Sequence, residues 1–228
     1  AEILWRSFFI QGAWNFKGMQ NLGFTWSMLP GLKRIAGDGI GKSAGRYLRF
    51  FNTHPYMAPT IMGVLLNLEE QGDTGQADKL KQTLSSALAA IGDSFFWATL
   101  KPIAALLFLL AAMTGAVWAM ALVLIAYNAL HVWTMAWGFS RGYRSGPEGA
   151  LAVGRVLSVG RAAKASYAIP LLAGMALASL SAWPGIGEGM PLAAGVFILS
   201  LAAHRFKLGV FRLFYGVFAL TLIWTIVR

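Results

Sequence analysis

The chain has 228 residues, of which 57% are hydrophobic and only 12% charged, with no cysteine and a formal net charge of +10. A soluble protein carries about twice that share of charged residues, so the composition indicates an integral membrane protein. The absence of cysteine excludes disulfides, thiolate metal sites and thiol catalysts. The basic residues flank apolar segments, which favours anionic lipids rather than nucleic acid as their partner.

The N-terminal part, residues 1–92, is amphipathic and rich in aromatic residues. If its first segment is helical, Ser7, Gln11 and Asn15 lie on one face and form a polar stripe in an apolar body. Such a stripe is typical of a helix that faces a partner or a cavity. We therefore expect residues 1–92 to face both a partner and a ligand.

The remaining part, residues 93–228, begins with a long block without charge at 102–140. The block exceeds the ~20 residues that one helix needs to cross a bilayer. It forms either one long tilted span or a hairpin of two helices, near 95–113 and 116–138, with the bend at Thr114-Gly115.

Asp93 lies in the sequence Gly92-Asp93-Ser94, directly before the first apolar segment. A short acidic side chain in this position is typical of a helix N-cap. The alternative is that Asp93 faces a partner or a cavity.

Three shorter apolar stretches follow, near 167–183, 190–203 and 211–227. The segment between, 141–164, carries five basic residues and one acidic residue. The positive-inside rule therefore predicts a cytoplasmic loop at 141–164. The sequence as a whole predicts an all-α, multi-pass integral membrane protein with four or five apolar transmembrane or re-entrant helices in its second part.

Two prolines, Pro55 and Pro59, prevent a regular helix across residues 50–59. Irregular backbone in a membrane protein is tolerated only where it is buried in protein or lines a cavity. We expect a helix to begin near Pro59 and to end near Gln71, with two glutamates at its end.

Polar side chains gather on both sides of this helix start. Amides and carboxylates supply the paired donors and acceptors that sugar hydroxyls need, so the set is a candidate site for a polyhydroxylated ligand. The alternative is that these residues cap helices, bond to the backbone or end a helix in water. The candidates are Asn52, His54, Asn67, Glu69 and Glu70.

No motif of a self-sufficient enzyme occurs: there is no P-loop, no G-x-G-x-x-G that opens a helix, no G-x-S-x-G and no H-E-x-x-H. We therefore expect no catalytic residue, no metal ligand and no cofactor in this chain.

Several strings resemble the enzyme IID component of the mannose/fructose/sorbose family of sugar phosphotransferase systems. The most specific is Phe50-Phe51-Asn52-Thr53-His54-Pro55-Tyr56-Met57-Ala58. The others, in the family's order, lie at 11–16, 19–24, 28–30, 68–71, 91–93, 96–97, 101–102 and 138–142. The resemblance adds Thr53 to the candidate sugar-binding residues.

The resemblance implies a non-catalytic membrane subunit of the bacterial cytoplasmic (inner) membrane. Such a subunit pairs with a IIC subunit, in trimers of IIC-IID pairs, to bind and translocate a hexose by an elevator-like displacement. Separate soluble IIA and IIB proteins phosphorylate the sugar on the cytoplasmic side. The alternative is a non-transporting structural or regulatory subunit that stabilises a partner membrane protein.

Overall fold

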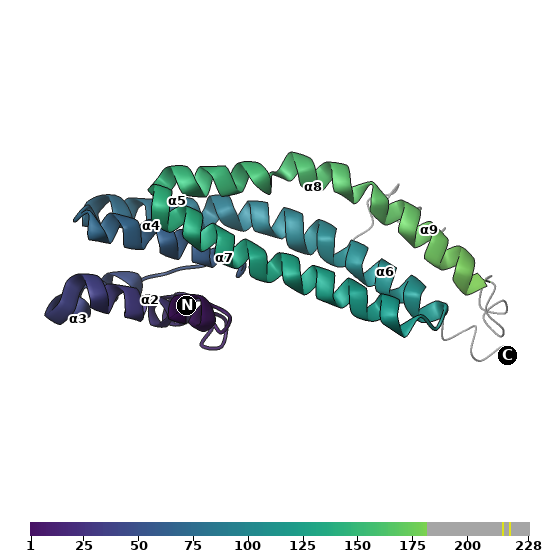
Figure 1. Ribbon diagram of the computed structural model, residues 1–228, viewed down its shortest axis with the longest axis horizontal. Coiled ribbons are helices and arrows are strands. Elements are labelled where there is room, and N and C mark those ends of the chain that lie inside the picture. Colours follow the sequence, from purple (N-terminus) through teal and green to yellow (C-terminus); the bar gives the residue numbers. More distant parts are fainter. Residues whose placement is uncertain (182–215, 217–218, 220–228) are drawn as a thin grey trace. The chain divides into compact units, whose positions relative to one another are not determined.

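The computed structural model describes residues 1–181, 216 and 219 (Figure 1). The chain divides into two compact units, Ala1–Leu172 and Ala173–Arg228. The expected helix near 190–203 lies outside the described residues, and of the one expected near 211–227 only residues 216 and 219 are described. Apart from helix α9, which contains the boundary between the units, the features discussed below belong to the first unit.

Most of the described residues are helical, and the chain is an all-α membrane protein, as expected. Besides helices, the described part contains two isolated β-bridges, which join Met19 to Asn15 and to Phe51. The elements are α1 (Glu2–Ser7), α2 (Asn21–Ala36), the 3-10 turn η1 (Gly37–Gly39), α3 (Ile40–Tyr47), α4 (Ala58–Glu70), α5 (Thr74–Gly92), the π-helix η2 (Asp93–Leu100), α6 (Lys101–Met113), α7 (Val117–Val156), α8 (Val159–Ser166) and α9 (Ala168–Ser181).

Helix α4 lies at the centre of the core. Every residue from Ala58 to Leu66 is buried, and α4 packs against α2, α5 and α7. The contact with α7 is close because glycines line it: a Cβ on Gly63 would collide with the carbonyl oxygen of Phe139, and one on Gly142 with that of Thr60. Small residues at such spacing let two helix backbones approach within a membrane protein.

The chain reverses direction inside α7. Gly146 has φ 54°, a left-handed conformation that suits glycine, and Pro147 follows it at the start of the returning helix. Figure 1 shows the chain turning back after the long first part of α7. The expectation of a loop at 141–164 is therefore wrong, because one tight turn separates two helices and α8 follows.

Helices α5, η2 and α6 join end to end in one helix from Thr74 to Met113. A turn at Gly115, with φ 69°, leads into α7, and α6 and α7 pack side by side (Figure 1). Residues 102–140 thus form the hairpin alternative. Asp93 is not an N-cap, since it lies inside the continuous helix. The expected boundary between the amphipathic part (1–92) and the transmembrane part (93–228) also falls inside this helix.

The long helices expose their apolar side chains. Two apolar windows, in the helices Thr74–Met113 and Val117–Ser166, are long enough to cross a membrane, and only 11% of each is buried. Trp118 and Ile125 are 74% and 65% exposed. The core helix of a soluble protein would be covered instead, so these surfaces are suited to lipid or to another membrane protein.

The N-terminal segment is less helical than expected. Helix α1 ends at Ser7, and residues 8–20 form turns. The prediction that Ser7, Gln11 and Asn15 form a polar stripe on one helix face is therefore wrong. Asn15 instead organises the turn: its Oδ1 accepts a hydrogen bond from the Gly18 N–H at 2.7 Å, and its Nδ2 donates to Asn21 Oδ1 at 2.9 Å. Local side-chain to backbone bonds of this kind compete with helix.

Candidate functional site

Hydrogen bonds of Thr53 hold the irregular segment before α4 against Gln20 on one side and α5 on the other. The Gln20 amide donates to the Thr53 carbonyl at 3.0 Å and accepts from the Thr53 N–H at 3.0 Å. The Thr53 hydroxyl donates to the carbonyl of Ser85 in α5 at 3.0 Å. Thr53 is therefore buried, and its backbone and hydroxyl groups are hydrogen-bonded within the chain, whereas the side chain of the neighbouring Asn52 is exposed.

His54 is buried, with 1% of its surface exposed, in an aromatic cluster. Its ring stacks on Phe96 at 5.3 Å and lies 4.7 Å from the ring of Trp97, both in η2. Nδ1 accepts a hydrogen bond from the Tyr56 N–H, and Nε2 has no partner among the described residues. Burial, helped by the charge of His131, lowers the pKa of His54 to about 4, so the imidazole is neutral at physiological pH.

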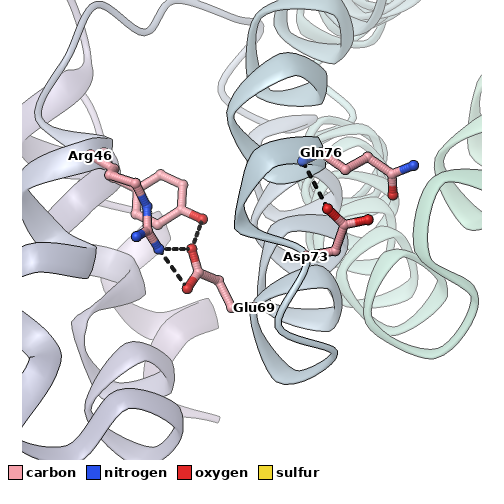
Figure 2. A network of polar contacts seen from close by, with 5 residues as sticks. Arg46, Glu69, Asp73 and Gln76 are labelled. Atoms are coloured by element: carbon pink, nitrogen blue, oxygen red, sulfur yellow. Dashed lines mark hydrogen bonds and ion pairs between the residues drawn. The ribbon is translucent and has the colours of Figure 1, made fainter.

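Glu69 belongs to a buried ion-pair network that joins α3 to α4. Arg46 donates to both carboxylate oxygens, at 2.5 and 2.8 Å, and the Tyr47 hydroxyl donates to one of them at 2.6 Å. Figure 2 shows Arg46 and Glu69 pointing toward one another. Burial and the bond to Glu69 raise the pKa of Tyr47 far above its usual range, so its proton stays in place.

Asn67 and Glu70 point toward α7 instead. Asn67 Nδ2 donates to the Tyr143 carbonyl at 2.9 Å, next to the reversal at Gly146. Glu70 is exposed, accepts a hydrogen bond from the Tyr143 hydroxyl and lines a cavity of about 270 Å³ together with Arg34. The two adjacent glutamates therefore do not share one site.

The structure separates the sequence-based candidates into two groups. Residues 52–54 precede the N-terminus of α4, and Asn67, Glu69 and Glu70 lie at its C-terminal end. Thirteen helical residues span ~20 Å. One monosaccharide does not reach both groups.

A polar pocket lies beside the first group. It has a volume of about 280 Å³ and lies between α1 and its following turn, residues 55–56, the η2–α6 junction and α7. Its polar and aromatic lining residues are Ser7, Phe8, Gln11, Tyr56, Trp97, Lys101 and His131. Of the residues expected to face a partner or cavity, Gln11 lines this pocket, whereas Asn15 organises a turn and Asp93 is exposed.

Trp97, Lys101 and His131 are among the pocket residues that sequence reasoning missed. Lys101 carried a usable signal, because it is the last charge before the uncharged block and a charge near the membrane interior is costly without a function. His131 stacks on Tyr56 with ring centroids 3.6 Å apart. The two residues are 75 positions apart in the sequence, so no local sequence pattern predicts this contact.

The pocket has the chemistry of a binding site for a hydroxylated ligand. An amide, an ammonium group, an imidazole and a hydroxyl supply hydrogen bonds, while Trp97 and Tyr56 offer aromatic faces. No group of three or more His, Asp or Glu in the described residues is arranged to hold a metal ion.

Comparison with known families identifies the chain. The family model described as the PTS system mannose/fructose/sorbose family IID component matches residues 1–183. The chain therefore belongs to this family of sugar phosphotransferase membrane components.

Curated relatives agree with this assignment. The chain is 37% identical over 153 residues to the mannose-specific EIID component of Escherichia coli (strain K12), covering 63% of this chain and 54% of the relative. It is 33% identical over 151 residues to the fructose permease IID component of Bacillus subtilis (strain 168), covering 63% of this chain and 55% of the relative. The chain thus matches about half the length of these relatives.

Two solved structures resemble the fold. A chain of the mannose transporter ManYZ, solved in complex with microcin E492, aligns with a TM-score of 0.60 at 26% identity, covering 97% of this chain and 93% of that one. A structure described only as a membrane protein aligns with a TM-score of 0.71 at 26% identity and the same coverage.

Proposed function

We propose that the chain is the IID subunit of a mannose-type phosphotransferase transporter, and that it pairs with a IIC subunit to bind and translocate a hexose. The pairs form trimers that move the sugar by an elevator-like displacement in the bacterial cytoplasmic membrane. Soluble IIA and IIB proteins phosphorylate the sugar, and this chain itself is non-catalytic. The observation that carries the proposal is the polar, aromatic-lined pocket at the η2–α6 junction.

The pocket suits one face of a sugar ring. Gln11 donates hydrogen bonds to hydroxyl groups, and the indole of Trp97 packs on the apolar face of the ring. The neutral His54 lies behind Tyr56 and Trp97 and fixes their positions by ring contacts of 4.8 and 4.7 Å. A IIC subunit supplies the remaining sugar contacts.

The sequence-based sugar residues keep distinct roles in this proposal. Asn52 and Glu70 are exposed, so their side chains are accessible to a sugar or a partner. Thr53, Asn67 and Glu69 already have partners within the chain, so they act on the sugar site by positioning it. Asp93 is exposed on η2 and faces the partner subunit.

The proposal is tested by transport in cells that express the chain with a IIC subunit and the soluble components. Gln11→Ala and Trp97→Ala should each reduce uptake of labelled mannose, glucose or fructose at least tenfold, while co-purification of the two membrane subunits is retained. Gln82→Ala and Trp118→Ala are matched controls, since both side chains are exposed outside the pocket, and they should leave uptake unchanged.

A second candidate is a non-transporting structural or regulatory subunit. Thr53, Asn67 and Glu69 favour it, because their side chains bond to partners within the chain and do not line the polar pocket. A stable complex that supports no uptake with any hexose would select this alternative.

A further inference from the structure

An apolar groove runs along one face of the α6–α7 hairpin. Lys101, Ala104, Ala105 and Phe108 have the i, i+3, i+4, i+7 spacing of a single helix face, and Val123, Leu124 and Tyr127 of α7 lie opposite. Together these residues line an open groove with a volume of about 360 Å³. Its lining is apolar except for Lys101 and Tyr127.

The groove ends at a positive charge. Lys101 lines both the groove and the polar pocket, and it has no ion pair or hydrogen bond to any described residue. On α6 the groove extends from Lys101 to Phe108, a helical distance of ~10 Å. The groove is therefore an apolar surface about two helical turns long with a cation at one end.

We propose that this groove binds one acyl chain of an anionic phospholipid of the phosphatidylglycerol class, with the lipid phosphate against the Lys101 ammonium group. The phosphate supplies the counter-charge that Lys101 lacks, and the chain covers the apolar side chains of Ala105 and Phe108. A helix of a partner protein fits less well, because it would bury the Lys101 charge against an apolar surface unless it carried an acid.

The lipid site is tested by native mass spectrometry of the full chain, purified from membranes together with any membrane partner that stays bound. The protein is exchanged into nanodiscs containing equal amounts of phosphatidylglycerol and phosphatidylcholine, and the retained lipid is identified. The wild type should retain phosphatidylglycerol in preference to phosphatidylcholine.

Two variants separate headgroup from chain recognition. Lys101→Gln should lower the preference for phosphatidylglycerol about fivefold, the factor that corresponds to the ~1 kcal/mol of one lysine near an anionic surface. Ala105→Phe fills the groove and should reduce retention of both lipids. Lys79→Gln, at an exposed lysine on the same long helix, is the matched control and should retain the wild-type preference.

Three results would overturn the proposal. These are an equal effect of Lys101→Gln and Lys79→Gln, retention that is insensitive to Ala105→Phe, and a photo-cross-link from position 105 to a protein segment instead of a lipid. The measurement contains no sugar, so it can fail while the transport experiment succeeds, and the reverse.

Discussion

Glu69 and Glu70 are adjacent in the chain, but their carboxylates have opposite surroundings. Glu69 is 7% exposed and bound by Arg46 and Tyr47, whereas Glu70 is exposed and bound by one hydroxyl. A sequence shows two acids at the end of a helix and cannot show that a guanidinium group 23 residues away neutralises only the first.

Replacing Glu69 by glutamine should lower the free energy of unfolding by ~3 kcal/mol, because it leaves Arg46 charged, largely buried and without its counter-ion. Glu70→Gln retains an acceptor for the Tyr143 hydroxyl and should change the stability by less than ~0.5 kcal/mol. Thermal unfolding in detergent, followed by tryptophan fluorescence, compares the two. Equal losses would show that the Arg46–Glu69 pair contributes no special stability.

His54 makes the stability of the protein depend on pH. Its pKa is lowered from 6.5 to about 4 by burial and by His131, so between these values the unfolded chain binds a proton that the folded chain does not. The contribution of neutral His54 is fully present above pH 6.5 and is lost as the pH falls from 6.5 toward 4. Melting temperatures measured across this range should fall less steeply for His54→Gln, which does not titrate, than for the wild type. Parallel pH profiles would refute the assignment.

At the scale of elements, sequence patterns were informative where they were local. The helix expected from about Pro59 to Gln71 is confirmed as α4 (Ala58–Glu70), since Pro59 in its first turn suits a helix start. The hairpin bend at Thr114-Gly115 was one of two alternatives, and Gly115 with its positive φ provides it.

Where the sequence predicted an element wrongly, contacts between residues far apart in the chain determine the observed structure. Gly92-Asp93-Ser94 resembles a cap, but packing of Gly92 against His54 continues the helix through this point. The polar stripe assumes a helix through Gln11 and Asn15, yet the chain turns there, Met19 bridges to Phe51 and Gln20 pairs with Thr53. The polar pocket was missed for the same reason, since its lining comes from four separate parts of the chain.

The α4–α7 contact gives a test of close helix packing. Gly142→Ala places a methyl group on the Thr60 carbonyl and should destabilise the fold by ~1–3 kcal/mol. Gly45→Ala, in α3 with open space around it, should be neutral or stabilise by up to ~1 kcal/mol through helix propensity. Thermal unfolding of both variants checks the pair, and similar behaviour would mean that α4 and α7 are not in such close contact.

At the scale of the whole molecule, the hairpin predicts membrane sidedness. Residues 117–145 of α7 span ~43 Å, enough to cross the ~30 Å hydrocarbon core. The basic residues around the reversal at Gly146 favour the cytoplasm, which leaves the Gly115 turn outside.

Because the chain has no cysteine, single cysteines report this topology without background. Thr114→Cys should react with a membrane-impermeant maleimide added to intact cells from which the outer membrane has been removed. Ser145→Cys should react only after the cytoplasmic membrane is opened, and both residues are exposed. Labelling of both positions from one side would contradict a hairpin that crosses the membrane.

The π-helix η2 also restricts how the length of this chain can change. It lies between α5, anchored to the core, and α6, whose first residue Lys101 lines the pocket. Deleting one residue between Asp93 and Leu100 would turn everything that follows by about 100° around the helix axis. Lys101 would then point away from the pocket and the groove, so the length of this eight-residue segment is constrained independently of its side chains.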